Sequence, residues 1–266
     1  MSETFLELVP KSAISLRQSM TELEASGLPF DGYNLPELRR KDQQFLQPEE
    51  LMQMRLEGSI SEKKQLTLHL RTRERSVQET IDRLRLATRS GVDLALLVTG
   101  DPLAEADSFC MHAQNVLPML SKTPLKIAVG ADLYQPHWGR WGQKIDAIHS
   151  GIVDAVFTQP IFDPSVFHDI DERTRDLLPR ERIYAGITWM ATERSRRYWH
   201  ERNGVPLAHL PHGESDEEIS RNSLSQAVDT LRTAKQEGYS TYVMLMRNTT
   251  AQLERIFSMA ENIQEA

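Results

Sequence analysis

The sequence alternates short apolar segments with longer amphipathic segments, and this alternation recurs eight times in 266 residues. Apolar runs bounded by Gly or Pro are typical of buried strands, and apolar residues at helical spacing are typical of helices that cover a sheet. Strands that alternate with helices form a parallel sheet, because each helix returns the chain to the end where the next strand begins. The predicted strands span residues 5–10, 28–36, 65–70, 92–99, 125–130, 153–158, 182–188 and 241–246.

Eight strand–helix units in roughly 250 residues match the size of a (β/α)8 TIM barrel. We therefore expect an α/β fold with a single domain over residues 1–266. A doubly wound sheet is the alternative, but no Gly-x-Gly-x-x-Gly motif follows the first strand, which argues against a Rossmann fold. In a barrel, functional residues lie at the carboxyl ends of the strands.

Capping residues mark the helix boundaries. Ser12 opens a helix predicted over residues 12–25, and Ser76 and Ser215 each begin a Ser-x-x-Glu capping box. Gly238 ends the helix that follows Ser215, because glycine tolerates the left-handed conformation of a helix end. The other predicted helices span residues 48–57, 105–121, 138–150, 164–178, 192–202 and 250–263.

Composition and charge limit the classes of partner and the cellular compartment that we expect for this protein. The net charge is −7 and the cations form no basic tract, so neither nucleic acid nor an anionic membrane is an expected partner. The acidic start lacks a secretory leader, and no apolar run approaches roughly 18 residues, so we expect a cytoplasmic protein. Cys110 is the only cysteine, which excludes an internal disulfide and a cysteine metal cluster, and no metal site is expected.

The fourth predicted strand, residues 92–99, is followed at once by Gly100-Asp101-Pro102. Pro102 cannot continue a strand ladder, and Gly100 lets the backbone turn or approach a ligand closely. Asp101 therefore stands at the carboxyl end of a buried strand. There it either contributes to a site or only caps the following helix.

Polar residues stand at the carboxyl ends of all eight predicted strands. Together they suit a polar, planar ligand, and paired carboxylates can transfer protons if burial raises the pKa of one of them. A lone histidine or carboxylate such as His69 or Asp132 is more often structural than catalytic. Arg247 can anchor a ligand or form an ion pair with Glu7 or Asp101. In chain order the eight residues are Glu7, Asn34, His69, Asp101, Asp132, Gln159, Thr188 and Arg247.

Several short motifs occur in an order shared with one enzyme family. They are Glu7-Leu8-Val9-Pro10, Leu68-His69-Leu70, Thr99-Gly100-Asp101-Pro102, Phe157-Thr158-Gln159-Pro160-Ile161-Phe162-Asp163, Ala185-Gly186-Ile187, the helix start at Gly213–Asp216, and Leu245-Met246-Arg247. With these motifs the chain resembles the methylenetetrahydrofolate reductases over nearly its whole length. The Gly-Asp-Pro and Thr-Gln-x-x-Phe-Asp stretches are the most specific parts of the resemblance.

The resemblance implies a (β/α)8 barrel that binds FAD, takes a hydride from NADH or NADPH, and reduces 5,10-methylenetetrahydrofolate to 5-methyltetrahydrofolate. It implies that Glu7 is the general acid that helps to open the methylene bridge, and that Asp101 lies between flavin and pterin. Gln159, Arg247 and Asn34 would bind the folate. The residues implied to hold the cofactor are His69, Thr99, Gly100, Asp132, Arg140 and Lys144.

The chain departs from the family where the flavin is held. The family's aromatic-Pro-Glu-x-His-Pro stretch is absent from residues 130–138. Arg140 and Lys144 are the only nearby cations in the helix that normally supplies basic residues to the FAD phosphates. Pro211 stands where the family has a phenylalanine that stacks with folate or nicotinamide.

These departures motivate a second hypothesis, a flavin-free protein on the same barrel that binds folate or another pterin, or handles its methyl group. A third is an unrelated barrel enzyme acting on another ring substrate, because one fold supports many chemistries. The partner expected under the first two hypotheses is a folate small molecule. Self-association and a partner protein are left open.

Overall fold

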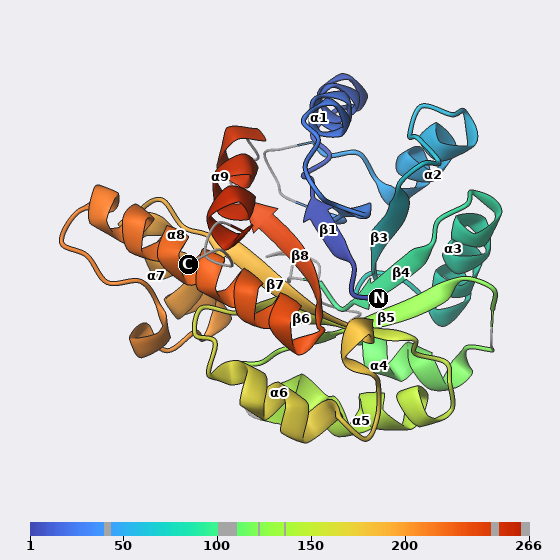
Figure 1. Cartoon of the computed structure of the whole chain (residues 1–266). Helices are drawn as coiled ribbons and strands as arrows, with labels where there is room; N and C mark the ends of the chain where they lie inside the picture. The colour runs from blue at the N-terminus through green and yellow to red at the C-terminus, as the bar shows by residue number, and fades with distance from the viewer. Residues whose placement is uncertain (40–43, 101–110, 122, 136, 246–249, 262–266) are drawn as a thin grey trace.

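In the computed structural model the eight strands close into one barrel, in which each strand pairs in parallel with the next and β8 pairs with β1 (Figure 1). The structure describes residues 1–39, 44–100, 111–121, 123–135, 137–245 and 250–261. The predicted (β/α)8 TIM barrel is confirmed. The strands are β1 (Thr4–Glu7), β2 (Gly32–Leu35), β3 (Gln65–Arg71), β4 (Leu94–Val98), β5 (Lys126–Ala131), β6 (Ala155–Pro160), β7 (Ile183–Trp189) and β8 (Ser240–Leu245).

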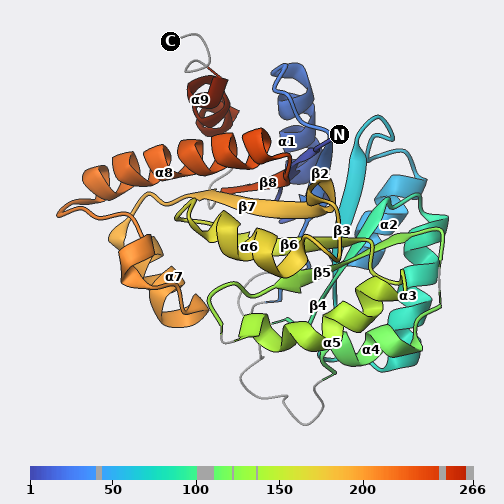
Figure 2. The ribbon, with the colours of Figure 1, turned by 60° about the horizontal axis from the view of Figure 1, so that its bottom comes forward.

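Helices surround the barrel, and α8 lies along β7 and β8 (Figures 1 and 2). The α-helices are α1 (Ala13–Ala25), α2 (Pro48–Leu56), α3 (Val77–Arg89), α4 (Ala113–Val116), α5 (His137–His149), α6 (Val166–Thr174), α7 (Glu193–Asn203), α8 (Asp216–Glu237) and α9 (Thr250–Glu261). None of these helices, within the described residues, is both long and apolar enough to span a membrane.

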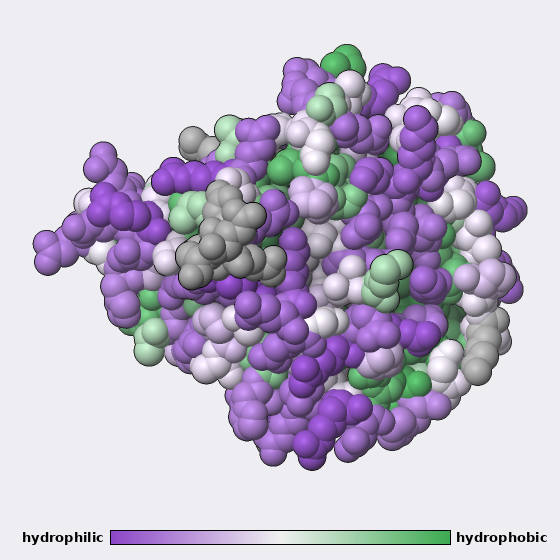
Figure 3. All heavy atoms as spheres, in the orientation of Figure 1, coloured by the Kyte–Doolittle hydropathy of each residue, from purple (hydrophilic) through white to green (hydrophobic). Residues whose placement is uncertain are grey.

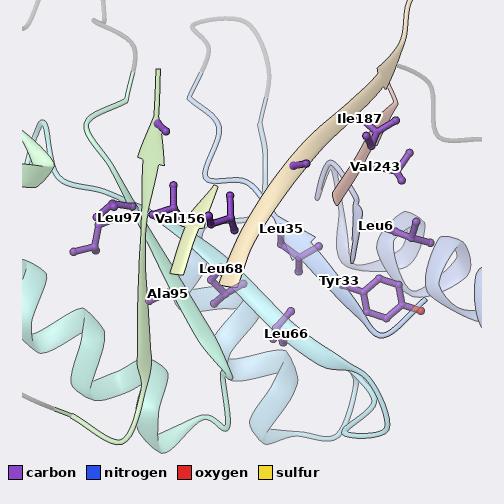
Figure 4. Packing of buried hydrophobic residues seen from close by; sticks show 14 of the residues in the cluster. Leu6, Tyr33, Leu35, Leu66, Leu68, Ala95, Leu97, Val156, Ile187 and Val243 are labelled. Atoms are coloured by element: carbon purple, nitrogen blue, oxygen red, sulfur yellow. The ribbon is translucent and has the colours of Figure 1, made fainter. Parts of the chain in front are cut away.

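Alternation along the strands separates two apolar layers. Side chains on the outer face of the barrel pack against the helices, and Figure 4 shows part of this layer, with Leu6 of β1, Leu68 of β3 and Val243 of β8 among its members. Successive side chains of a strand point to opposite faces, so the intervening residues fill the barrel. The interior cluster consists of Phe5, Leu94, Leu96, Ala128, Ala155, Phe157, Tyr184 and Tyr242.

Aromatic rings block the barrel on the side where the strands begin. The rings of Phe157 and Tyr184 are stacked, with centroids 4.3 Å apart and an interplanar angle of 10°. Phe5 also stacks on Tyr184, with the two ring centroids 5.2 Å apart. The interior is therefore a packed core and not a channel.

The predicted helix caps are present at Ser12, Ser76 and Ser215, each of which accepts a hydrogen bond from a backbone N–H of the first turn. The capping box at Ser76 is complete. In the other predicted box, the Glu218 carboxylate accepts from the backbone N–H of Glu214 instead of Ser215. These bonds fix the helix starts within a residue of their predicted positions.

The helix predicted over residues 105–121 is wrong within the described residues. The helix begins at Ala113, after an extended His112, and residues 117–119 form a 3-10 turn. Pro118 has no N–H to donate to the preceding turn, so the α-helix cannot continue through it. Residues 101–110 lie outside the described part of the chain.

An extra helical segment follows β7. The helix α7 and a 3-10 turn at Leu207–His209 precede α8, the helix that packs on the barrel. A small apolar cluster holds this segment against the loop after β6. Its buried members are Phe162, Met190, Trp199, Val205 and Leu210.

Candidate functional site

Glu7, Asn34 and His69 form a hydrogen-bonded chain near the carboxyl ends of β1, β2 and β3. Asn34 Nδ2 donates to Glu7 Oε2 at 2.9 Å, and Asn34 Oδ1 lies 2.9 Å from His69 Nε2. The His69 Nε2 atom is also 4.0 Å from Glu7 Oε2. Glu7 and Asn34 are buried, and the His69 side chain is 15% exposed. Three residues far apart in the sequence are thus brought into contact.

Alternation along the strands directs these three side chains into the barrel. Neighbouring residues such as Leu6 and Leu35 belong to the outer layer that packs on the helices. Because successive side chains of a strand point to opposite faces, Glu7, Asn34 and His69 face the interior. The same apolar pattern that builds the barrel therefore also orients this polar cluster.

Burial decides the protonation of the cluster. It raises the pKa of Glu7 to about 8, although the hydrogen bond from Asn34 opposes the shift. It lowers the pKa of His69 to about 4. At neutral pH Glu7 is therefore protonated and His69 is neutral, so their approach to 4.0 Å is not an ion pair. Asn34 Oδ1 can only accept, which places the proton of the neutral imidazole on Nε2.

Tyr242 is a buried, uncharged side chain close to Glu7. It pairs in register with Phe5, two residues before Glu7, and its hydroxyl donates to the backbone oxygen of Thr158 at 2.6 Å. Burial, together with the nearby Glu7, raises the pKa of Tyr242 well above its usual range. Gly186 leaves room for the ring, because a Cβ there would lie 2.8 Å from Tyr242 Oη.

Gln159 and Thr188 present buried polar atoms on the neighbouring strands β6 and β7. Within the described part of the chain, Gln159 Oε1 and Thr188 Oγ1 have no hydrogen-bond partner. Gln159 stands where the pairing of β6 with β7 shifts register between Phe157 and Pro160. A buried polar atom without a partner is costly, so both atoms suggest a binding function.

Asp132 and Lys144 form a second polar pair, at the carboxyl end of β5. The buried Lys144 donates from Nζ to the backbone oxygen of Gly130. Burial raises the pKa of Asp132, and the nearby Lys144 opposes that shift. Burial lowers the pKa of Lys144, and Asp132 opposes that shift in turn. Arg140 lies in α5, and its side chain is outside the described part of the structure.

Thr99 and Gly100, at the end of β4, bond to neighbouring protein groups. Thr99 Oγ1 accepts from the backbone N–H of Ala113 at 3.2 Å, and Arg73 Nε donates to the backbone oxygen of Gly100 at 3.0 Å. Gly100 has a φ of +83°, and a Cβ there would lie 2.8 Å from Arg71 Nε. This position therefore needs glycine for two reasons, its backbone conformation and the adjacent guanidinium group.

Asp101, implied by the resemblance to lie between flavin and pterin, and Arg247, implied to bind the folate, lie outside the described residues. Their roles stay predictions. The described residues of the site thus form three groups, at the ends of β1 to β3, of β4 and β5, and of β6 and β7. Because the strands are parallel, all three groups lie at the same end of the barrel.

The sequence analysis did not single out Arg71 and Tyr242. Arg71 is buried at the end of β3, and its Nη2 lies 2.5 Å from Glu74 Oε1. The alternation of side chains along the strand could have indicated Arg71, because it stands two residues after His69 and so shares a strand face with it. Tyr242 reads as an ordinary apolar strand residue, and only the closure of β8 onto β1 brings it next to Glu7.

The described residues do not fit a flavin dinucleotide held as the resemblance implies. Lys144 is buried and bonded to a backbone carbonyl, so its charge is not presented to a phosphate. The Thr99 hydroxyl is bonded to Ala113, and His69 Nε2 is bonded to Asn34. A pyrophosphate needs charge-assisted donors, and the bonded Lys144 and the neutral His69 do not offer them.

The chain matches none of the known protein families and none of the curated proteins with which it was compared. It is similar in structure to a 7,8-dihydropteroate synthase from Vibrio fischeri, with a TM-score of 0.55, 11% identity, and coverage of 99% of this chain and 92% of that one. It is also similar to an uncharacterized protein from Clostridium thermocellum that binds two copies of 5-methyl-5,6,7,8-tetrahydrofolic acid. That comparison gives a TM-score of 0.60 and 14% identity, and it covers 100% of this chain and 95% of that one.

A third similar structure is an F420-dependent secondary alcohol dehydrogenase in complex with an F420-acetone adduct. Its TM-score is 0.56 at 10% identity, with coverage of 98% of this chain and 100% of that one. At such identities the likeness shows the fold, and it agrees with the closed barrel seen here. The resemblance to the reductase family is neither repeated nor contradicted by these comparisons.

Proposed function

We propose that this barrel is a reductase that converts 5,10-methylenetetrahydrofolate to 5-methyltetrahydrofolate with NADH or NADPH. The observation that carries the proposal is the protonated, buried Glu7 within the hydrogen-bonded chain to Asn34 and His69. Opening a methylene bridge requires an acid that still holds its proton at neutral pH, and a carboxyl group meets this requirement only when burial raises its pKa.

In the proposed reaction Glu7 donates its proton to the bridge nitrogen that leaves, and the other nitrogen forms an iminium with the methylene carbon. A hydride from the reduced nicotinamide then adds to this carbon and gives the methyl group. Glu7 is left as a carboxylate, which Asn34 Nδ2 stabilises through its hydrogen bond. His69 bonds to Asn34 Oδ1, which fixes the amide in the orientation that this requires.

The structural comparisons support a pterin as the substrate class. Two of the similar structures, of a synthase acting on a pterin and of a protein that binds 5-methyltetrahydrofolate, use the same barrel for ligands of this kind. The F420-dependent dehydrogenase is an example of hydride chemistry on the barrel. The resemblance stated above adds the order of the motifs around Glu7 and Gln159.

The direct test incubates the purified protein with 5,10-methylenetetrahydrofolate and NADH or NADPH. We expect loss of the nicotinamide absorbance and one equivalent of 5-methyltetrahydrofolate, identified by mass spectrometry. An absorbance spectrum of the protein shows whether a flavin is carried through purification, because the flavin ring absorbs visible light. Absence of the methyl product with both nucleotides would contradict the proposal.

The second candidate is a protein that binds a folate or handles its methyl group without redox chemistry. It is favoured by Lys144, whose Nζ donates to the backbone oxygen of Gly130 and does not present its charge to a flavin phosphate. Tight binding of 5-methyltetrahydrofolate, without any oxidation of NADH or NADPH by the methylene compound, selects this candidate over the reductase.

A further inference from the structure

Thr188 is a buried polar residue that the proposed reaction does not use. Its side chain is on β7, it is 2% exposed, and its Oγ1 has no hydrogen-bond partner within the described residues. A threonine hydroxyl has one proton to donate and two lone pairs that accept. A buried hydroxyl without a partner is less favourable than a hydrogen-bonded one. The Thr188 hydroxyl therefore adds no hydrogen bond to the described residues that would stabilise the free protein.

Register and alternation place this hydroxyl in the barrel interior, opposite Met244 of β8. Thr188 pairs with Met244, and Met244 pairs with Glu7 of β1, so the three residues form one row across adjacent strands. Tyr184, four residues earlier on β7, belongs to the interior cluster, and side chains two or four apart share a face. Two strand spacings of about 4.8 Å separate Thr188 from Glu7, which gives a span of roughly 10 Å.

The neighbouring strand β6 supplies a second unpaired group, the Gln159 Oε1 atom. Gln159 lies at the register shift of β6 between Phe157 and Pro160 and is partly exposed, so a ligand can approach the pair from its side. The row thus has a protonated acid at one end, the apolar Met244 in the middle, and two unpaired oxygens on β6 and β7 at the other end.

We propose that Thr188 is a ligand-binding residue whose hydroxyl, together with Gln159 Oε1, pairs with the N–H-bearing edge of a planar heterocycle that lies across Met244 toward Glu7. This inference rests on the proposed function and extends it, since it assigns the far edge of the pterin to a residue on β7. An N–H-bearing edge is required because Gln159 Oε1 can only accept. The ring gains the hydrogen bonds that the free protein leaves unmade.

The test measures the dissociation constant of 5-methyltetrahydrofolate by titration calorimetry for the wild type and three variants. Thr188→Val removes the hydroxyl and keeps the shape, and we expect about tenfold weaker binding, the equivalent of one lost hydrogen bond. Thr188→Ser keeps the hydroxyl and should restore wild-type affinity. Thr67→Val is the matched control, because Thr67 Oγ1 is also buried and has no partner among the described residues, but lies two residues before His69, deeper in the barrel.

Thermal unfolding of the same variants separates a binding role from a structural one. A hydroxyl that stabilises the free protein would lower the melting temperature when removed, whereas an unpaired one leaves it unchanged or raises it. Unchanged affinity in Thr188→Val, or equal weakening in Thr67→Val, overturns the inference and leaves the proposed function standing. If the wild type binds no folate, the proposed function itself fails, and the inference fails with it.

Discussion

Glu7 experiences two opposing effects. Desolvation disfavours its carboxylate, while the hydrogen bond from Asn34 favours it, and desolvation is the larger of the two. The pKa moves from its ordinary 4.5 to about 8, which corresponds to a difference on the order of 5 kcal/mol between the protonation states. Because of this difference, the Glu7 carboxyl group still holds a proton at neutral pH and can donate it.

Glu7→Gln tests this role. The amide keeps the shape and the bond to Asn34 but has no acidic proton, so we expect folate reduction to fall by at least about 100-fold. Binding of 5-methyltetrahydrofolate should change by less than about threefold, because the substitution preserves packing. Steady-state nicotinamide oxidation and titration calorimetry provide the two measurements.

The control for this substitution is Glu3→Gln. Glu3 precedes the same strand, at the other end of the barrel, where its carboxylate accepts from Gln65 and Tyr184. This variant should retain full activity. A Glu7→Gln protein as active as the wild type would remove Glu7 from the mechanism.

The ends of β3 and β4 are joined by packing of a guanidinium group against a glycine. Gly100 has a positive φ, and the Arg71 guanidinium group occupies the space of its missing side chain. Arg73 bonds to the carbonyl oxygens of Thr99 and Gly100. The backbone that precedes Asp101 is thereby fixed from β3, and not by β4 alone.

Gly100→Ala should destabilise the protein by about 2 kcal/mol. Roughly 1 kcal/mol of this comes from the left-handed backbone, and the rest from displacement of the buried Arg71. Gly27→Ala is the matched control, because Gly27 has a φ of +71° and no atom within 4 Å of a built Cβ. Urea unfolding should show a smaller loss for Gly27→Ala, and equal losses would contradict the role of Arg71.

A buried charge network connects the loop after β2 with β3, α3 and α2. Glu37, whose side chain is fully buried, accepts from the backbone N–H of Arg71 at 2.7 Å and lies 2.9 Å from Arg83 Nη2. Arg83 Nε lies 2.6 Å from Glu49 Oε1, and this second carboxylate is 42% exposed. The same guanidinium group thus has one buried and one half-exposed partner.

Glu37→Gln should destabilise the protein by about 3 kcal/mol, because it leaves the buried Arg83 charge without its buried partner. Glu49→Gln removes the other partner of the same guanidinium, but solvent screens that pair, so we expect a loss below about 1 kcal/mol. Denaturant unfolding of the two variants compares them. A larger loss for Glu49→Gln would show that Glu37 is not the principal partner.

For the molecule as a whole, closure of the barrel leaves one end available for a ligand. Stacked aromatic rings fill the interior on the side where the strands begin, and the polar cluster occupies the carboxyl end. The outer surface in Figure 3 is mostly polar, with apolar groups in small separate patches. Because titratable groups are buried in this interior, the free energy of unfolding depends on pH.

Glu7 and His69 affect that stability in opposite directions. The folded-state pKa of Glu7 is raised from 4.5 to about 8, so unfolding releases a proton between these pH values and stability falls as pH rises. The folded-state pKa of His69 is lowered from 6.5 to about 4, so unfolding takes up a proton in that window and stability rises with pH up to 6.5. The two effects nearly cancel between pH 4.5 and 6.5.

Of these two effects, only that of Glu7 remains between pH 6.5 and 8, and its slope is about 1.4 kcal/mol per pH unit. We therefore expect the free energy of unfolding to fall by about 2 kcal/mol across this window. Glu7→Gln should remove that decrease, since glutamine does not titrate. Urea unfolding at several pH values measures how the free energy of unfolding changes with pH in the wild type and in Glu7→Gln. An equal slope in the two proteins would contradict the assigned pKa of Glu7.

Much of the fold and part of the site could be predicted from local patterns. The eight strands follow from apolar runs, and the helix starts at Ser12, Ser76 and Ser215 from capping residues. Within the described residues the helix predicted over 105–121 is wrong, because Pro118 cannot donate the hydrogen bond that apolar periodicity alone implies. The strand ends identified Glu7, Asn34 and His69 as candidates, since barrels expose those positions at one mouth.

The sequence by itself determined the alternation of strands and helices, the closed-barrel size and the residues available at the strand ends, because each depends on spacing along the chain. The tertiary structure decided which of those residues touch, that Glu7 is protonated at neutral pH, and that Lys144 is bonded to Gly130 instead of facing a ligand. These properties depend on burial and on distances between atoms of different strands. They arise only when the barrel closes and water is excluded from its interior.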